Sequence, residues 1–166
     1  KNAVIVMDDA DLGLAVEGIL WSAFGTAGQR CTACSRVIVH KDVKEELESL
    51  LLTAMEQLTI GDGMDETVKI GPVINKKALE KIHNYVQIGK DEGAKLLVGG
   101  EILAEGNLGK GNYYAPTLFT NVDRDSRIAQ EEIFGPVVSL IEVSSLEEAI
   151  EVNNSVTFGL SSSIFS

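Results

Sequence analysis

The chain has 166 residues, of which 45% are hydrophobic and 23% charged, and these values are ordinary for a globular domain with one core. Its 14 basic and 25 acidic residues give a formal charge of −11, so we expect no nucleic-acid partner, and no apolar run approaches the roughly 18–20 residues that span a membrane. The two cysteines, Cys31 and Cys34, suit a reducing, cytoplasmic compartment better than a disulfide framework.

The first half of the chain alternates short apolar runs with amphipathic stretches. Residues 3–7 form a β-branched run typical of a buried strand, and the acidic turn that follows can cap a helix over 11–24. A strand over 37–40 and a helix over 42–58 come next. A turn-rich acidic stretch then predicts a loop over 61–72.

The second half continues the alternation with a predicted helix over 75–92 and a strand over 95–98. A Gly-rich loop over 106–112 leads into a strand over 113–120, and Pro116 within that strand favours an edge position or a bend. The remaining predicted elements are a short helix over 128–132, a strand over 136–143, a helix over 145–153 and a strand over 161–165.

This order of elements predicts an α/β fold with an open, largely parallel, twisted sheet flanked by helices. Both sides of the Gly-rich loop belong to the same alternation, so we expect a single domain over residues 1–166. The chain starts in a strand without Met and stops just after an apolar run, so we expect it to be a piece of a longer protein.

The segment between the first helix and the second strand is the strongest candidate for chemistry. Cys31 lies there among small residues, where backbone N–H groups can point at a bound oxygen, and the neighbouring Arg30 can favour a thiolate. A buried small hydrophobe is the commoner role of a cysteine. The spacing to Cys34 also permits a redox pair, whereas a zinc site is disfavoured because His40 and His83 lie at no ligand spacing. No metal is expected.

At this segment the sequence resembles the aldehyde dehydrogenase family. Phe-Gly-x-x-Gly-Gln-x-Cys over 24–31 is similar to the family's nucleophile motif, which implies that Cys31 is the catalytic nucleophile and that Gln29 supports its loop. Cys34 stands where family members more often carry Gly, Ala or Thr, so its role is open. The resemblance also makes Arg30 and Thr32, on either side of the nucleophile, the candidate substrate contacts.

A second segment, Glu-Glu-x-Phe-Gly-Pro over 131–136, resembles another motif of the same family. There Glu132 is expected to accept hydrogen bonds from the two hydroxyls of the nicotinamide ribose, and Phe134 to pack beside the nicotinamide of NAD or NADP. Without the resemblance, the glutamate pair would be a solvated helix end. The stretches 114–119 and 154–161 also match, and Asn154 is expected either to steady the nucleophile loop or to serve as a simple turn residue.

The resemblance implies oxidation of an aldehyde to a carboxylic acid through a thiohemiacetal and a thioester on Cys31. The family's general base would lie just before Lys1, and the dinucleotide-binding domain and the oligomerisation segment also lie mostly outside this chain, so we expect the fragment alone to be inactive. The full-length protein is expected to be a homo-oligomer.

The small-molecule substrate is an aldehyde, and Arg30 resembles members that act on carboxylate-bearing semialdehydes, although the side chain could equally point into solvent or a neighbouring loop. Two other functions stay open. One is a coenzyme A-acylating dehydrogenase that uses the same cysteine, and the other is a non-catalytic α/β module.

Overall fold

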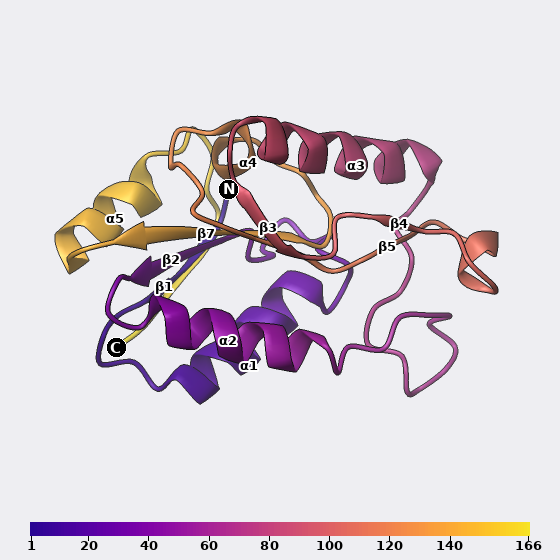
Figure 1. Ribbon diagram of the computed structural model, residues 1–166, viewed down its shortest axis with the longest axis horizontal. Helices are drawn as coiled ribbons and strands as arrows, with labels where there is room; N and C mark the ends of the chain where they lie inside the picture. The colour runs from indigo at the N-terminus through magenta and orange to yellow at the C-terminus, as the bar shows by residue number, and fades with distance from the viewer.

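A computed structural model describes residues 1–166 and has a six-stranded sheet with helices on both faces (Figure 1). The strands are Ala3–Val6 (β1), Arg36–His40 (β2), Lys95–Val98 (β3), Ile102–Leu103 (β4), Tyr113–Tyr114 (β5), Thr117–Thr120 (β6), Val137–Val143 (β7) and Ser162–Phe165 (β8). The helices are Leu12–Phe24 (α1), Lys44–Met55 (α2), Lys76–Asp91 (α3), the 3₁₀ turn Leu108–Lys110 (η1), Arg127–Gln130 (α4) and Leu146–Asn154 (α5).

The main sheet has the order β3-β6-β7-β2-β1-β8, and every neighbouring pair is parallel except β3 with β6. β4 and β5 form a separate antiparallel pair. The prediction of a largely parallel sheet is therefore confirmed. The central strands β2 and β7 are buried almost throughout, which is why they consist of near-continuous apolar runs.

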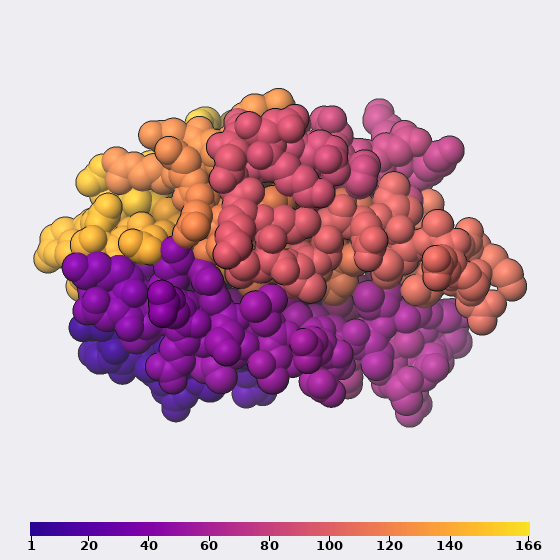
Figure 2. Space-filling view, in the orientation of Figure 1, coloured from indigo at the N-terminus to yellow at the C-terminus, as the bar shows by residue number.

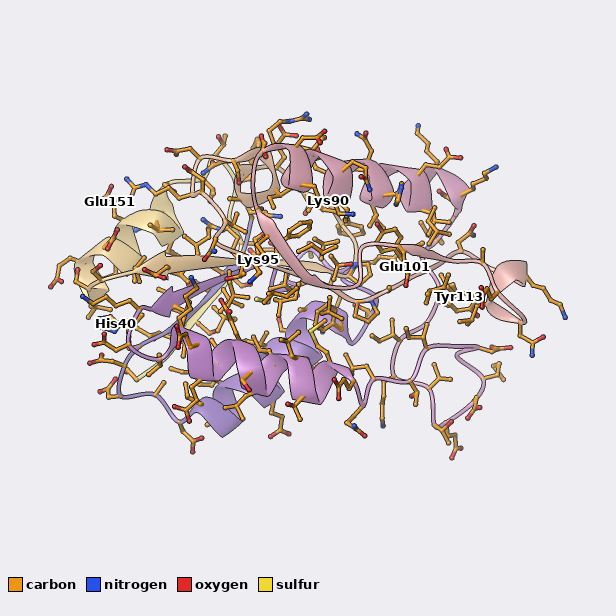
Figure 3. All side chains as sticks on the ribbon, in the orientation of Figure 1. His40, Lys90, Lys95, Glu101, Tyr113 and Glu151 are labelled. Carbon is orange, nitrogen blue, oxygen red and sulfur yellow. The ribbon has the colours of Figure 1, made fainter.

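The helices cover the two faces of the sheet in a way that follows from strand order. The β1-to-β2 connection carries α1 and the β7-to-β8 connection carries α5, and the two connections run across the sheet in opposite directions. Since such crossovers are right-handed, α1 and α5 must lie on opposite faces. In Figure 1, α1 and α2 lie below the sheet and α3 and α4 above it. Apolar side chains fill the space between these layers in one core (Figure 3).

The helix starts show how the sequence fixes the elements locally. Asp11 accepts a hydrogen bond from Leu14 N at 3.0 Å and so caps α1, as the acidic turn after β1 predicted. Asn75 caps α3 in the same way through Ala78 N at 2.9 Å. At one end of the molecule, the loop over 61–72 and the η1 segment project next to each other and border a shared pocket (Figure 2).

The structure differs from the sequence prediction in three places. The strand over 113–120 is broken at Pro116 as a bend, but the edge position is wrong, because β6 lies inside the sheet between β3 and β7. The helix expected over 128–132 is Arg127–Gln130, so Glu131 and Glu132 lie outside it in an extended segment. β4 and η1 are too short to produce a periodic pattern and were not predicted.

Candidate active site

The segment that carries Cys31 begins where α1 ends, with a turn that requires left-handed backbone. Ala27 has φ +52° and Gly28 has φ +67°, so the chain reverses direction within two residues. Cys31 is exposed, whereas Cys34 is only 4% exposed and its thiol donates to Arg36 O at 3.3 Å. Burial raises the pKa of Cys34 to about 12. Of the two thiols, only Cys31 is both accessible and free of a hydrogen bond that holds it in the core.

Asn2 holds the cysteine segment in place. Its amide nitrogen donates to Cys31 O at 2.7 Å and to Ala33 O at 3.2 Å. Its amide oxygen accepts from Leu160 N and Ser161 N, both at 2.9 Å. The residue is only 7% exposed and its amide is fully hydrogen-bonded, so it joins the segments that enter β1, β2 and β8. Sequence reasoning missed Asn2, although a lone amide directly before a buried strand was a signal that could have found it.

The two predicted loop-support residues behave differently. Gln29 connects the cysteine segment to the loop before α3, because its oxygen accepts from Ile74 N at 2.9 Å and its nitrogen donates to Pro72 O at 3.3 Å. Asn154 is exposed and accepts from its neighbour Asn153 at 3.0 Å, with no bond to the cysteine segment. Within this chain no hydrogen bond joins Asn154 to that loop, so a role in steadying it stays a prediction. Asn154 lies at the end of α5, where its side chain cannot replace the contacts that Asn2 makes.

The 131–136 segment packs directly against the cysteine segment. A Cβ atom on Gly28 would lie 2.0 Å from the carbonyl oxygen of Gly135, so the two backbones touch where neither residue has a side chain. This contact places Glu132 and Phe134, both exposed, next to the loop of Cys31. Phe134 has φ +60°, a left-handed conformation that a non-glycine residue adopts only when its surroundings enforce it.

One pocket joins these two segments. Its lining includes Cys31 and Arg30 from the first segment, Glu132 and Phe134 from the second, and Lys1 from the chain that enters β1. The structure therefore brings the predicted nucleophile and both predicted cofactor residues to one place. Lys1 Nζ is buried there without a hydrogen-bond partner, and the pKa of this amine is lowered to about 7, chiefly by burial and then by the nearby charge of Arg36.

The two predicted substrate residues lie on different sides of Cys31. Arg30 stacks over the ring of Trp21 at 4.2 Å, and its guanidinium donates to Trp21 O at 3.1 Å and Ser22 O at 3.3 Å. This side chain therefore neutralises the carbonyl end of α1, while its Nε atom is buried without a partner. Thr32 is exposed and borders a separate small pocket rather than the one that contains Cys31.

A second group of ionisable side chains lies at the carboxyl ends of the central strands, opposite to the ends where the cysteine segment enters the sheet. His40 ends β2, and its ring lies with the carboxylates of Asp8 and Asp42, all three ligand atoms within 4.8 Å of one another. His40 Nε2 donates to Ser144 O at 3.0 Å. Figure 3 shows His40 far from Tyr113, at the other end of the molecule. This histidine takes no part in the cysteine pocket.

The fold and the pocket together define a class of protein. An exposed cysteine, on a loop that enters the second strand of a parallel α/β sheet, shares a pocket with a carboxylate and an aromatic ring from the loop that enters a neighbouring strand. This arrangement suits an enzyme that forms a covalent bond through a thiol. None of the helices is both long and apolar enough to cross a membrane.

The family model described as "Aldehyde dehydrogenase family" matches residues 1–166, and the chain belongs to this family. It is 50% identical over 165 residues to an α-ketoglutaric semialdehyde dehydrogenase of Bacillus subtilis, and the match covers 99% of this chain and 34% of that protein. It is 45% identical over 164 residues to a 1-pyrroline-5-carboxylate dehydrogenase of Staphylococcus aureus, with 99% and 31% covered.

Solved structures show the same fold. A betaine aldehyde dehydrogenase of Staphylococcus aureus, crystallised in complex with NAD⁺, superposes with a TM-score of 0.97 at 38% identity. That match covers 99% of this chain and 33% of the other. The chain thus spans about a third of the length of the relatives it matches.

Proposed function

We propose that this chain is the nucleophile-bearing part of an NAD-dependent aldehyde dehydrogenase, and that Cys31 is its nucleophile. The observation that supports the proposal best is the shared pocket, in which an exposed thiol, the Glu132 carboxylate and the Phe134 ring meet from two loops. A carboxylate with two acceptor oxygens suits a ribose diol, and an exposed ring suits a flat nicotinamide. The relatives that were crystallised with NAD⁺ agree with this choice of cofactor.

The Cys31 sulfur, as thiolate, attacks the aldehyde carbon and forms a C–S bond, while the carbonyl electron pair moves to the oxygen. The backbone N–H groups of the cysteine segment stabilise that oxyanion, because Asn2 fixes the backbone of this segment through its bonds to Cys31 O and Ala33 O. The nicotinamide, when bound, supplies the acceptor for the hydride. The thioester left on Cys31 is then hydrolysed by water, which a base preceding Lys1 in the whole protein would activate.

The roles of the two thiols provide a direct test. In the whole protein that carries this chain, Cys31→Ser should abolish aldehyde oxidation, and iodoacetamide should alkylate Cys31 well before Cys34. Cys34→Ser is the matched control, because Cys34 is buried and donates to Arg36 O. It should retain most activity. Full turnover by Cys31→Ser would refute the proposal. Formation of an acyl-coenzyme A product instead of the free acid would assign the acylating activity.

We infer further that the substrate is an aldehyde that also carries a carboxylate. α-Ketoglutaric semialdehyde, in the name of a 50% identical relative, is such a molecule, whereas the betaine aldehyde of a 38% identical relative carries a cation. Arg30 places a positive charge on the lining of the Cys31 pocket, and its Nε atom there has no partner. A guanidinium in this place favours an anionic substrate, even though its other donors bind the end of α1.

Arg30→Gln tests the charge while preserving a donor for Trp21 O. We expect kcat/KM for a carboxylate-bearing semialdehyde to fall about tenfold or more, while the value for an uncharged aldehyde of the same length changes little. Arg30→Lys should recover part of the preference. The same loss for both aldehydes would show that Arg30 only supports α1, and the anionic substrate class would then be abandoned.

A further inference from the structure

Helix α3 contacts the 131–136 segment from the side opposite to the cysteine loop. Lys81 Nζ donates to the backbone carbonyl of Glu132 at 2.8 Å. One turn later, the hydroxyl of Tyr85 donates to Glu131 Oε2 at 2.7 Å. Residues four apart lie on the same face of a helix, so both donors point at the same stretch of chain. One helical face therefore fixes two consecutive residues of the segment.

Between Lys81 and Tyr85, an apolar side chain of α3 also contacts the 131–136 segment. Ile82 is fully buried, and a Cβ atom on Gly135 would lie 2.4 Å from its Cδ1 atom. The segment thus lies between Ile82 on one side and Gly28 on the other, with backbone or side-chain contact on both. A shift of this segment would separate it from α3 or press it into the cysteine loop.

The carboxylate of Glu131 is ionised and is bound by two neighbouring side chains. Arg127 donates to both of its carboxylate oxygens at 2.9 Å, and Tyr85 adds the third bond. These bonds, first from Arg127 and then from Tyr85, lower the pKa of Glu131 to about 2. Since the carboxylate of Glu131 is fully used for this attachment, it is not available to a ligand in the pocket.

The residues of the segment therefore divide into two sets. Glu131 is anchored to α3 and Ile133 is buried at 2% exposure, while Glu132 and Phe134 are exposed and line the pocket with Cys31. The left-handed backbone of Phe134 needs support from outside, because the conformation is unfavourable on its own. The contacts from α3 provide that support.

We propose that Lys81 and Tyr85 are positioning residues that set the place of Glu132 and Phe134 for binding the nicotinamide ribose. The inference rests on the proposed function. It adds that α3, a helix that does not line the pocket, determines the position of the two residues that would contact the cofactor. It predicts an effect on cofactor binding and little effect on aldehyde binding, because the cysteine loop is held by other residues, Asn2 and Gln29.

The test uses the whole protein that carries this chain. Lys81→Met removes the donor with its length preserved, and Tyr85→Phe removes only the hydroxyl. Each should raise KM for NAD by about fivefold, because a segment that has lost one of these hydrogen bonds must be ordered again when NAD binds, with KM for the aldehyde unchanged. Lys81→Arg should restore the wild-type value. Lys77→Met, at an exposed position one turn before Lys81, and Tyr113→Phe, whose hydroxyl makes no hydrogen bond, are the matched controls.

NADH binding, followed by fluorescence in a Cys31→Ser background, separates the positioning from the chemistry. Weaker NADH binding in both α3 variants, with both controls like wild type, supports the inference. Unchanged NADH binding and KM for NAD in both variants overturns it, and so does an equal rise in both Michaelis constants. Neither of these results bears on the role of Cys31 as the nucleophile. That role would be refuted only if the Cys31→Ser variant oxidised the aldehyde.

Discussion

Replacing Gly28 by alanine examines the contact between the cysteine loop and the 131–136 segment. The residue has φ +67°, and its Cβ would lie 2.0 Å from Gly135 O and 2.4 Å from Gly135 C. An ordinary contact is about 3.4 Å, so the two segments must move apart by more than about 1 Å. A displacement of that size between reacting groups can reduce turnover roughly 100-fold. We expect this loss of kcat/KM in Gly28→Ala.

Gly93→Ala is a matched control for the backbone part of the effect. Gly93 has φ +88°, and a Cβ there would meet nothing within 4 Å. Urea unfolding should show a loss of about 1 kcal/mol for Gly93→Ala, from the left-handed conformation alone, with normal activity. Gly28→Ala should lose roughly 2–4 kcal/mol, because the steric overlap adds to the same conformational cost. Equal stability losses and normal activity in both variants would show that the contact between Gly28 and Gly135 does not set the relative position of the two loops.

Two further predictions concern the amino end of the chain. Asn2→Ala should destabilise the fold by roughly 2–4 kcal/mol and lower kcat, since four hydrogen bonds are lost, while Asn154→Ala should change unfolding free energy by less than about 0.5 kcal/mol. Lys1→Met should stabilise the chain by several kcal/mol below pH 7 and by nothing above pH 10.5. The folded pKa of Lys1 is about 7 against 10.5 unfolded, so the unfolded chain binds the extra proton between these values and wild-type stability rises with pH there. Unfolding curves measured from pH 6 to pH 10.5 check this, and a flat difference between variant and wild type would contradict it.

Local signals explain why most elements were predictable. β2 and β7 are runs of β-branched and other apolar residues, and the α3 start carries a capping asparagine, so their type follows from a few neighbouring residues. The two motifs that suggested Cys31 and Glu132 are likewise short and contiguous. The structure brings both into one pocket, as the resemblance implied.

The residues that sequence analysis missed act over long separations. Asn2 bonds to residues around 31–33 and 160–161, and Lys81 reaches a carbonyl 51 residues away. Nothing near Asn2 or Lys81 in the sequence indicates these partners, because they are set by strand order. Asn154 was chosen because it belongs to a matching stretch, yet its place as the last residue of α5 leaves it exposed.

The position of the pocket within the sheet explains why positively charged side chains are placed near it. Parallel α/β sheets commonly bind ligands at the carboxyl ends of their strands, where helix N-termini supply partial positive charge. Here the lining comes from segments that enter β1, β2 and β7, so the pocket lies at the amino ends, where helices finish and their free carbonyls are negative. Under the proposed function this site stabilises a thiolate and an oxyanion, so it needs positive charge from side chains.

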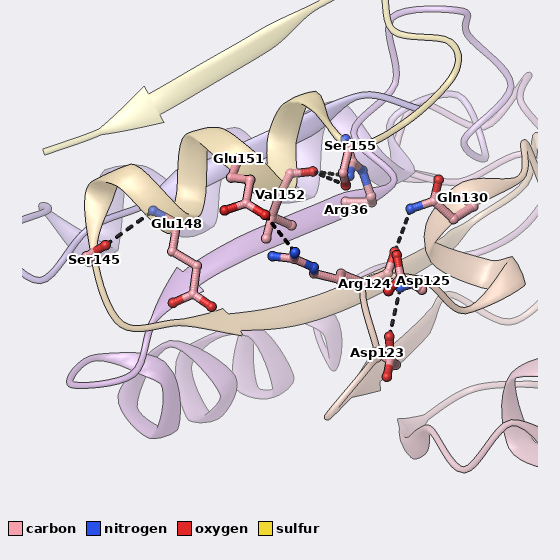
Figure 4. A network of polar contacts seen from close by, with 10 residues as sticks. All are labelled: Arg36, Asp123, Arg124, Asp125, Gln130, Ser145, Glu148, Glu151, Val152 and Ser155. Carbon is pink, nitrogen blue, oxygen red and sulfur yellow. Dashed lines mark hydrogen bonds and ion pairs between the residues drawn. The ribbon is translucent and has the colours of Figure 1, made fainter.

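The chain meets that need with cations attached to the helix ends. Arg30 donates to Trp21 O and Ser22 O at the end of α1. Arg36 donates to Val152 O and Asn153 O at the end of α5, both at 2.9 Å, and a part of this contact is drawn in Figure 4. Both guanidiniums neutralise helix carbonyls in a chain with a formal charge of −11, but only Arg30 lines the pocket that contains Cys31. Arg30 therefore has a structural reason to lie beside Cys31 whatever the substrate is, and only the charge-specific comparison of two aldehydes can separate that reason from recognition of an anion.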